Sequence, residues 1–156
     1  MTREVLVFLH MDDKNSGYIG DYFQRQKIPF RIIRSYADEA VPRLDGSIAG
    51  LVFMGGVMSA NDDISWIKQE IDLIRAAVQA NIPVLGHCLG GQLISRALGS
   101  PVTSNPVGEV GWHQCFKQNN SRSVEWLGDI DNPFMMFHWH YETFAIPDKA
   151  QLLFSS

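Results

Sequence analysis

The sequence predicts an α/β fold, in which a mostly parallel, doubly wound sheet is flanked by helices. Apolar, β-prone segments alternate with segments of helical periodicity through the first two-thirds of the chain. The first such segment, Val5–Leu9, is apolar at every position, as is typical of a parallel strand buried on both faces. Strands that alternate with helices favour parallel pairing, because a parallel neighbour needs a crossover connection.

The remaining elements of this part follow from the same two periodicities. The clearest helix is expected over Asp63–Ala80, where apolar residues recur at steps of three and four, and Asn61 or Asp62 is placed to cap its N-terminus. Its apolar positions are Ile64, Ile67, Ile71, Ile74 and Val78. Further helices are expected over Ser16–Gln26 and Leu89–Ala97, and further strands at Phe30–Tyr36, Leu51–Met54 and Ile82–Leu85.

The pattern changes after Gly99, where a glycine ends the last of these helices. Shorter strands are expected at Val110–Phe116, Val124–Leu127 and Phe134–Trp139, separated by polar loops. No linker, repeat or low-complexity tract divides the chain. We therefore expect a single domain over residues 1–156.

Composition excludes several classes of protein. A chain of 156 residues with 46% hydrophobic and 19% charged residues is typical of a soluble globular domain. The net charge of −4 and the lack of a basic cluster argue against nucleic acid or an anionic membrane as a partner. The two cysteines, Cys88 and Cys115, are too few for a disulfide framework, and we expect a cytoplasmic protein.

The segment Gly86–Gln92 carries the strongest chemical signal. It lies where a buried strand is expected to lead into a helix, and Cys88 has a glycine two positions away on each side. A sharp strand-to-helix turn leaves no room for flanking Cβ atoms, and it places the central thiol at the positive end of a helix. This pattern predicts a nucleophile elbow with cysteine as the nucleophile. The alternative for the same residues is a buried, inert cysteine at a glycine-rich helix start.

Four segments in order resemble the motifs of the class I glutamine amidotransferases. They are the nucleophile loop Gly86–Gln92, the strand and glycine pair Leu51–Gly56, the segment Glu109–Trp112, and the segment His140–Phe144 with Ile146 and Pro147. The resemblance implies the flavodoxin-like fold of that family for the chain from Val5 onward. It also implies an enzyme that hydrolyses the amide of glutamine, or of a related γ-glutamyl compound, and releases ammonia.

The resemblance assigns roles residue by residue. Cys88 is the nucleophile that forms a γ-glutamyl thioester, and the backbone N–H groups of Leu89 and Gly56 form the oxyanion hole. Gln92 and His140 are expected to line the substrate pocket. The amidase step of the family needs no cofactor and no metal. The implied partners are glutamine or another γ-glutamyl small molecule, and a synthetase or a second copy of the chain.

One part of the family pattern is missing. The family's general base is a histidine in a His-Pro-Glu segment, and none of the five histidines here is followed by proline. We therefore expect a domain that lacks the C-terminal His-Pro-Glu region, and an impaired or inactive fragment of a longer amidotransferase. Glu142 also stands where the family usually has aspartate.

Two alternatives of other classes remain open. The first is a non-catalytic binding or regulatory module of the same fold, which the missing base would favour. The second is a metal-binding protein, because His138, His140 and Glu142 alternate along one expected strand and so share a face. Two imidazoles and a carboxylate are a ligand set for Zn²⁺ or Fe²⁺.

Overall fold

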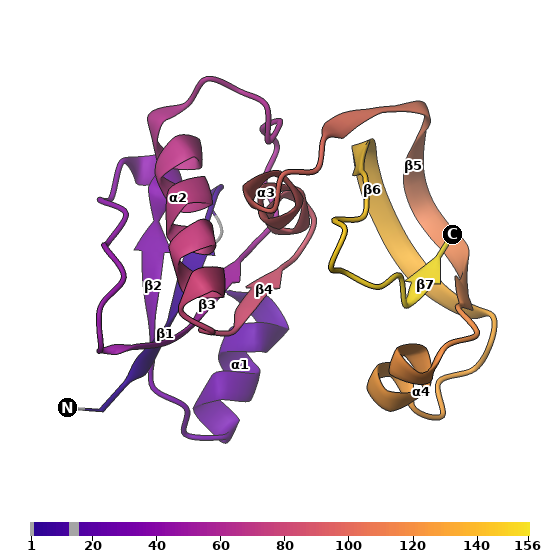
Figure 1. Cartoon of the computed structure of the whole chain (residues 1–156), viewed down its shortest axis with the longest axis horizontal. Coiled ribbons are helices and arrows are strands. Elements are labelled where there is room, and N and C mark those ends of the chain that lie inside the picture. The colour runs from indigo at the N-terminus through magenta and orange to yellow at the C-terminus, as the bar shows by residue number, and fades with distance from the viewer. Residues whose placement is uncertain (1, 13–15) are drawn as a thin grey trace. The chain divides into compact units, whose positions relative to one another are not determined.

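The computed structural model describes residues 2–12 and 16–156 and is shown in Figure 1. Contacts divide the chain into two compact units, of which the first ends at Gly99 and the second is Ser100–Ser156. Within the described residues, no helix has the length and apolar character needed to cross a membrane.

The first unit contains a four-stranded, all-parallel sheet with the strand order β2-β1-β3-β4. Helices connect the strands, and the strand order reverses direction at β1, so the sheet is doubly wound as predicted (Figure 1). The strands are β1 (Glu4–Leu9), β2 (Phe30–Arg34), β3 (Ile48–Phe53) and β4 (Val84–Gly86). The helices are α1 (Gly17–Arg25), the short 3₁₀ helix η1 (Ser35–Ala37), α2 (Ser65–Gln79) and α3 (Leu89–Ala97).

The core lies on both faces of the central strands. Residues Leu6 to Leu9 of β1 are all buried, which confirms the predicted two-sided strand. Ile19 and Phe23 of α1 pack against the cluster of Val7, Leu9 and Val52 on one face. Because side chains alternate along a strand, Phe8 and Phe53 point to the other face, where their rings stack with centroids 4.6 Å apart.

The predicted N-cap of α2 is wrong. The capping position is held by Ile64, in extended conformation and without a side-chain hydrogen bond. Asn61 and Asp62 belong instead to a turn that precedes the helix, where the Asp62 carboxylate accepts from the backbone N–H of Ser59 at 3.1 Å. The predicted apolar face is buried at Ile67, Ile71 and Ile74, whereas Ile64 precedes the helix and Val78, near its end, is exposed.

The second unit is an antiparallel sheet with the order β6-β5-β7. Its strands are β5 (Val102–Lys117), β6 (Phe134–Phe144) and β7 (Phe154–Ser155), so two of the expected strands exist and are longer than predicted. The strand expected at Val124–Leu127 is wrong, because these residues belong to the helix α4 (Ser121–Leu127). The Asn120 side chain starts this helix by accepting from the backbone N–H of Ser123 at 2.9 Å, a capping signal that outweighs the β-propensity of one short apolar run.

Candidate functional site

Cys88 lies on a strained turn between β4 and α3. Its backbone has φ of 53° and ψ of −113°, a conformation that L-residues rarely adopt. β4 ends at Gly86 and α3 begins at Leu89, so the turn occupies only two residues. The Cys88 thiol is exposed and makes no capping hydrogen bond, whereas Cys115 is buried. The geometry is that of the predicted elbow, with an accessible sulfur at a helix N-terminus.

The glycines on either side of Cys88 are required by close approach of the backbone. A Cβ atom added to Gly86 would lie 2.5 Å from the carbonyl carbon of Gly90, and one added to Gly90 would lie 2.0 Å from the carbonyl oxygen of Phe53. Neither distance is compatible with a side chain. Glycine at these two positions therefore lets α3 start directly against the end of β3.

The glycine pair after β3 lies beside the elbow. A Cβ on Gly55 would contact the Cys88 side chain, at 3.4 Å from its Cβ and 3.9 Å from its Sγ. A Cβ atom added to Gly56 would lie 2.8 Å from both the Leu89 side chain and the His10 Cβ. Leu89 is the first residue of α3, where helix geometry leaves the backbone N–H without an acceptor inside the helix. The structure thus brings Cys88, Leu89 and the Gly55-Gly56 pair together.

Backbone hydrogen bonds tie the elbow to the end of β3. The N–H of His87 donates to the carbonyl of Phe53 at 2.9 Å, and the N–H of Gly90 donates to the carbonyl of Met54 at 3.2 Å. Gln92, one turn into α3, is only 7% exposed, so it is not a solvated helix residue.

A buried polar network that was not predicted from the sequence supports the segment next to the glycine pair. His10, Glu70 and Ser35 are each 0% exposed. His10 contacts the Met54 carbonyl through Nδ1 at 2.8 Å and Glu70 Oε2 through Nε2 at 2.9 Å, while the Ser35 hydroxyl donates to Glu70 Oε1 at 2.5 Å. The signal for it was present, because Glu70 is a charged residue between Ile67 and Ile74 on the apolar face of α2.

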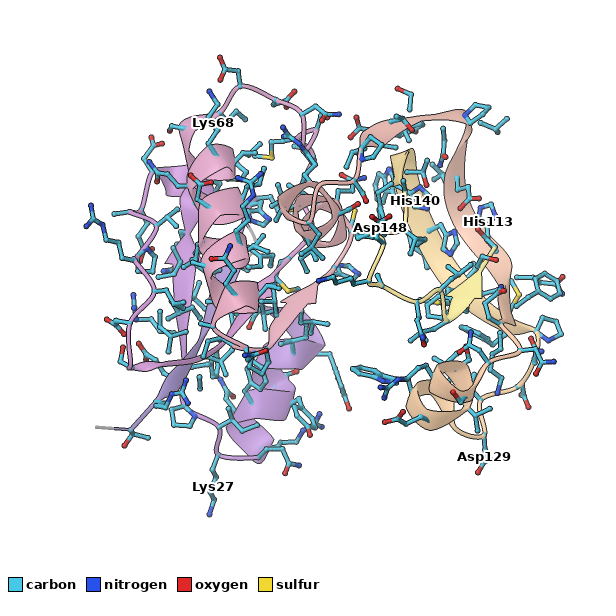
Figure 2. The ribbon with its side chains drawn as sticks, viewed as in Figure 1. Lys27, Lys68, His113, Asp129, His140 and Asp148 are labelled. Atoms are coloured by element: carbon cyan, nitrogen blue, oxygen red, sulfur yellow. The ribbon has the colours of Figure 1, made fainter. Side chains whose placement is uncertain are left out.

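The second unit carries a separate histidine and carboxylate cluster. His138 Nδ1 lies 2.6 Å and His140 Nε2 lies 3.2 Å from Glu109 Oε2, and the His113 ring stacks on that of His138. His113 and His140 come from β5 and β6 respectively (Figure 2). The hydrogen bond from His138 holds the pKa of Glu109 below its ordinary value, and burial opposes this effect. Glu109 is therefore an ionised acceptor at neutral pH.

The ligand set predicted for a metal is corrected by this cluster. Among the described residues, the group whose ligand atoms lie within 4.8 Å of one another is Glu109, His113 and His138. Glu142 lies opposite Ser104, beyond a register shift that separates this pair from Glu109 and His140. Glu109, His113 and His138 could hold a divalent cation, but the ion would have to displace the direct 2.6 Å bond between His138 and Glu109.

A family model for class I glutamine amidotransferases matches residues 10–156. The chain belongs to the class I glutamine amidotransferase family. This amidotransferase chain is 31% identical over 128 residues to a glutamine amidotransferase-like protein of Salmonella typhimurium, a match that covers 79% of the chain and 54% of the relative. It is 31% identical over 93 residues to the glutamine-hydrolysing GMP synthase of Clostridium perfringens, which covers 59% of the chain and 17% of the relative.

A solved structure gives the same result for the fold. The crystal structure of a glutamine amidotransferase from Methylobacillus flagellatus superposes with a TM-score of 0.93 at 38% identity, covering 99% of this chain and 61% of the other. The predicted α/β fold of the class I amidotransferases is confirmed. The amidotransferase chain spans little more than half the length of its Salmonella relative.

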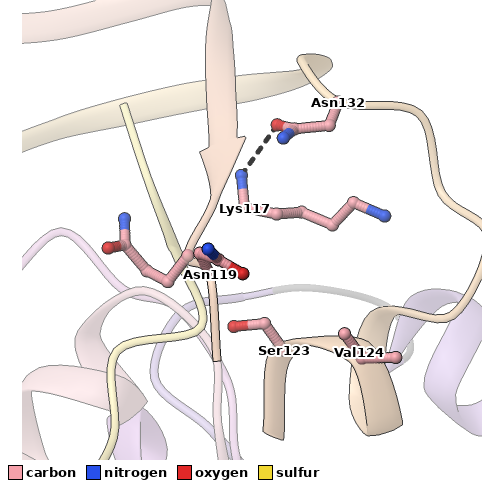
Figure 3. Close-up of a pocket in the computed structure, with 6 residues that line it drawn as sticks. Lys117, Asn119, Ser123, Val124 and Asn132 are labelled. Atoms are coloured by element: carbon pink, nitrogen blue, oxygen red, sulfur yellow. Dashed lines mark hydrogen bonds between the residues drawn. The ribbon is translucent and has the colours of Figure 1, made fainter. Parts of the chain in front are cut away.

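A pocket of about 250 Å³ lies in the second unit of the amidotransferase chain (Figure 3). It is lined by Lys117, Gln118, Asn119, Ser123, Val124 and Asn132. The backbone N–H of Lys117 donates to the Asn132 side chain at its edge, at 2.9 Å. No cysteine or histidine lines this pocket, so it contains none of the residues that the family resemblance assigns to amide hydrolysis.

Proposed function

We propose that the protein hydrolyses the γ-carboxamide of glutamine, or of a related γ-glutamyl compound, through a thioester on Cys88. Membership of the class I glutamine amidotransferase family supports glutamine amide hydrolysis in general. The observation that carries the assignment to Cys88 is its accessible thiol on a strained strand-to-helix turn, at the N-terminus of α3. At this position the free backbone N–H groups of the first turn of α3 can donate to an oxyanion that forms beside the sulfur.

The reaction takes place in two steps. The Cys88 sulfur attacks the amide carbon, and the tetrahedral intermediate collapses with cleavage of the C–N bond and departure of ammonia, which takes up one proton. Water then attacks the thioester, the C–S bond breaks, and glutamate and the free cysteine are formed. In both steps, the N–H groups of Leu89 and Gly56 donate to the oxyanion. We assign substrate binding to Gln92 from its place one turn into α3, and to His140 on the family resemblance alone.

The proton source for the leaving ammonia is proposed to lie outside this sequence. The His-Pro-Glu pattern requires a proline directly after the histidine, and none of the five histidines has one. We propose that the two compact units belong to one amidotransferase domain, completed by such a segment, because the family model extends across both of them. The chain by itself is then slow or inactive in turnover while its nucleophile remains reactive.

The ammonia is proposed to pass to an acceptor bound by a synthetase. The similarity to a glutamine-hydrolysing GMP synthase supports this class of partner. The two free cysteines fit a reducing cytoplasm. A purely regulatory module of the same fold would need neither an accessible thiol nor a strained turn.

The test is covalent labelling of the 156-residue chain with a glutamine analogue that carries a chloroketone in place of the γ-carboxamide. The Cys88 sulfur should displace chloride, lose its proton and add the mass of one analogue less HCl, with saturation kinetics and protection by glutamine. Cys88→Ala should abolish the adduct, while Cys115→Ala, which removes the buried thiol, should leave it unchanged. Labelling that persists in Cys88→Ala, or that glutamine does not slow, would contradict the proposal.

A further inference from the structure

We propose that the buried His10–Glu70 pair is a positioning device for the site, which holds the Met54 carbonyl and thereby fixes the Gly55-Gly56 pair against the start of α3. The inference deepens the proposed function and rests on it for its catalytic meaning. Neither side chain is exposed, so neither is a catalytic residue that touches substrate. Their effect on the site must pass through the backbone that they hold.

The hydrogen-bond pattern determines where the protons of the pair lie. A carbonyl oxygen can only accept, so His10 Nδ1, at 2.8 Å from the Met54 oxygen, must carry a hydrogen. The 2.9 Å contact between His10 Nε2 and Glu70 Oε2 also needs a hydrogen, on one atom or the other. The pair therefore shares one proton and is neutral as a unit, which is compatible with complete burial.

Further contacts hold the pair in one orientation. The Ser35 hydroxyl donates to the second oxygen of Glu70, and the His10 ring stacks on Trp66 with the planes 8° apart. The residues come from α2, from η1 and from the end of β1. The donor at Nδ1 is thus anchored by elements that do not belong to the elbow itself.

Met54 is the point at which this support reaches the site. Its carbonyl accepts from His10 Nδ1 at 2.8 Å and from the N–H of Gly90 at 3.2 Å, and the Gly90 N–H also donates to the His87 carbonyl at 3.0 Å. Gly90 is the second residue of α3, and Gly55, which follows Met54, lies against Cys88. The His10 side chain also leaves no room for a side chain at Gly56, because a Cβ atom on Gly56 would lie 2.8 Å from the His10 Cβ. One carbonyl therefore couples the glycine pair to the nucleophile helix.

The test compares substitutions in a Glu70→Gln background, where no unpaired charge is left in the core. The Glu70→Gln substitution by itself keeps every contact, because the new amide donates to the lone pair on His10 Nε2 and its oxygen accepts from Ser35. Adding His10→Asn keeps a donor at the position of Nδ1, whereas adding His10→Phe removes the donor but keeps a ring against Trp66. The two double variants separate the hydrogen bond to Met54 from the packing.

We expect Glu70→Gln and the His10→Asn double variant to react with the chloroketone analogue within about threefold of the unsubstituted chain. The His10→Phe double variant should react at least about tenfold more slowly, because the loss of one hydrogen bond corresponds to about a tenfold change in rate. Its alkylation by iodoacetamide, which needs only the thiol, should stay unchanged. The His10→Phe double variant should also be at least as stable to heat as the His10→Asn double variant. If the labelling rates of the variants instead rank in the same order as their thermal stabilities, the role of the His10–Glu70 pair is purely structural and the proposal is overturned.

Amide hydrogen exchange tests the positioning independently of the chemistry. The N–H of Met54, which donates to the Phe8 carbonyl at 3.0 Å, should exchange at least about tenfold faster in the His10→Phe double variant than in the His10→Asn double variant, because one hydrogen bond no longer holds this backbone. Equal exchange in the two would contradict the inference even if labelling differed. If the unsubstituted chain is never labelled at Cys88, the proposed function fails, and the exchange experiment still decides the role of His10.

Discussion

At the scale of single residues, the strained backbone of Cys88 has an effect that stability measurements can detect. Glycine is usually about 0.5–1 kcal/mol less favourable than alanine, but a left-handed conformation costs a residue with a Cβ roughly 1–2 kcal/mol. With φ at 53°, we expect Cys88→Gly to be about 1 kcal/mol more stable than Cys88→Ala in urea unfolding. The control is Ala76→Gly in α2, which should lose about 1 kcal/mol. A glycine variant less stable than the alanine variant would argue against strain at the elbow.

The neighbouring Gly90 makes a prediction of opposite direction. Alanine there would place a Cβ 2.0 Å from the Phe53 carbonyl oxygen. We expect Gly90→Ala to cost at least about 2 kcal/mol, because the clash outweighs the roughly 1 kcal/mol that alanine gains over glycine in a helix. Gly46 is the matched control, since a Cβ there would meet no atom within 4 Å. Equal stabilities of the two alanine variants would show that β3 and α3 can separate freely.

At the scale of elements, α4 depends on its first side chain. Asn120 accepts from the N–H of Ser123 and donates to the carbonyl of Leu152 at 3.1 Å, so it joins the helix to the segment before β7. We expect Asn120→Ala to lose about 1–2 kcal/mol, and Asn120→Asp to lose less because it keeps the cap. Asn119→Ala, one residue earlier, should be nearly neutral. Chemical denaturation followed by tryptophan fluorescence measures all three. An aspartate variant as destabilised as the alanine variant would assign the effect to the Leu152 contact alone.

The pairing of β5 with β6 should depend on pH through Glu109. Its folded pKa is lowered, chiefly by the hydrogen bond from His138. A lowered pKa adds stability above the ordinary value near 4.5, and this stability is lost as the pH falls through the folded value. We therefore expect Glu109→Gln to melt at a lower temperature than the unsubstituted chain at about pH 7, with the gap closing below about pH 4.5.

The control for this pH dependence is Glu125→Gln, which removes a carboxylate from the exposed pair with Arg122. It should melt like the unsubstituted chain at every pH, since exposed pairs contribute little. A gap for Glu109→Gln that widens as the pH falls would reverse the sign and contradict the assignment.

At the scale of the whole molecule, the proposal that the general base lies outside this sequence predicts chemical rescue. If Cys88 is reactive but no residue of this sequence protonates the leaving ammonia, exogenous imidazole should raise the rate of ammonia release from glutamine. We expect at least about tenfold, because general acid–base catalysis contributes about 10²–10⁴-fold when the group is positioned. Cys88→Ala should show no rescue. Fast turnover without imidazole would mean that a base lies within these residues, and His140→Ala would be the next measurement.

Local rules of sequence were sufficient for the order of strands and main helices up to Gly99 and for the turn at Cys88. The apolar run Val5–Leu9 and the alternation of strands with helices were enough for the parallel, doubly wound fold. The spacing of Gly86 and Gly90 around Cys88 was enough for the elbow, because the turn permits no Cβ at either position. The run Val124–Leu127 misled, since a single capping side chain decided between helix and strand there.

Which distant residues meet depended instead on how the elements pack. His10 and Glu70 are 60 positions apart, and Glu109 and His138 are 29 apart. Neither pair can be predicted from its spacing in the sequence. The first pair meets because α2 packs near the end of β1, and the second because of the register of β5 against β6. A strand pattern places side chains on a face, but the register selects their neighbours. The strand pattern predicted Glu142 as the carboxylate near His138, but the register of β5 against β6 places Glu109 there.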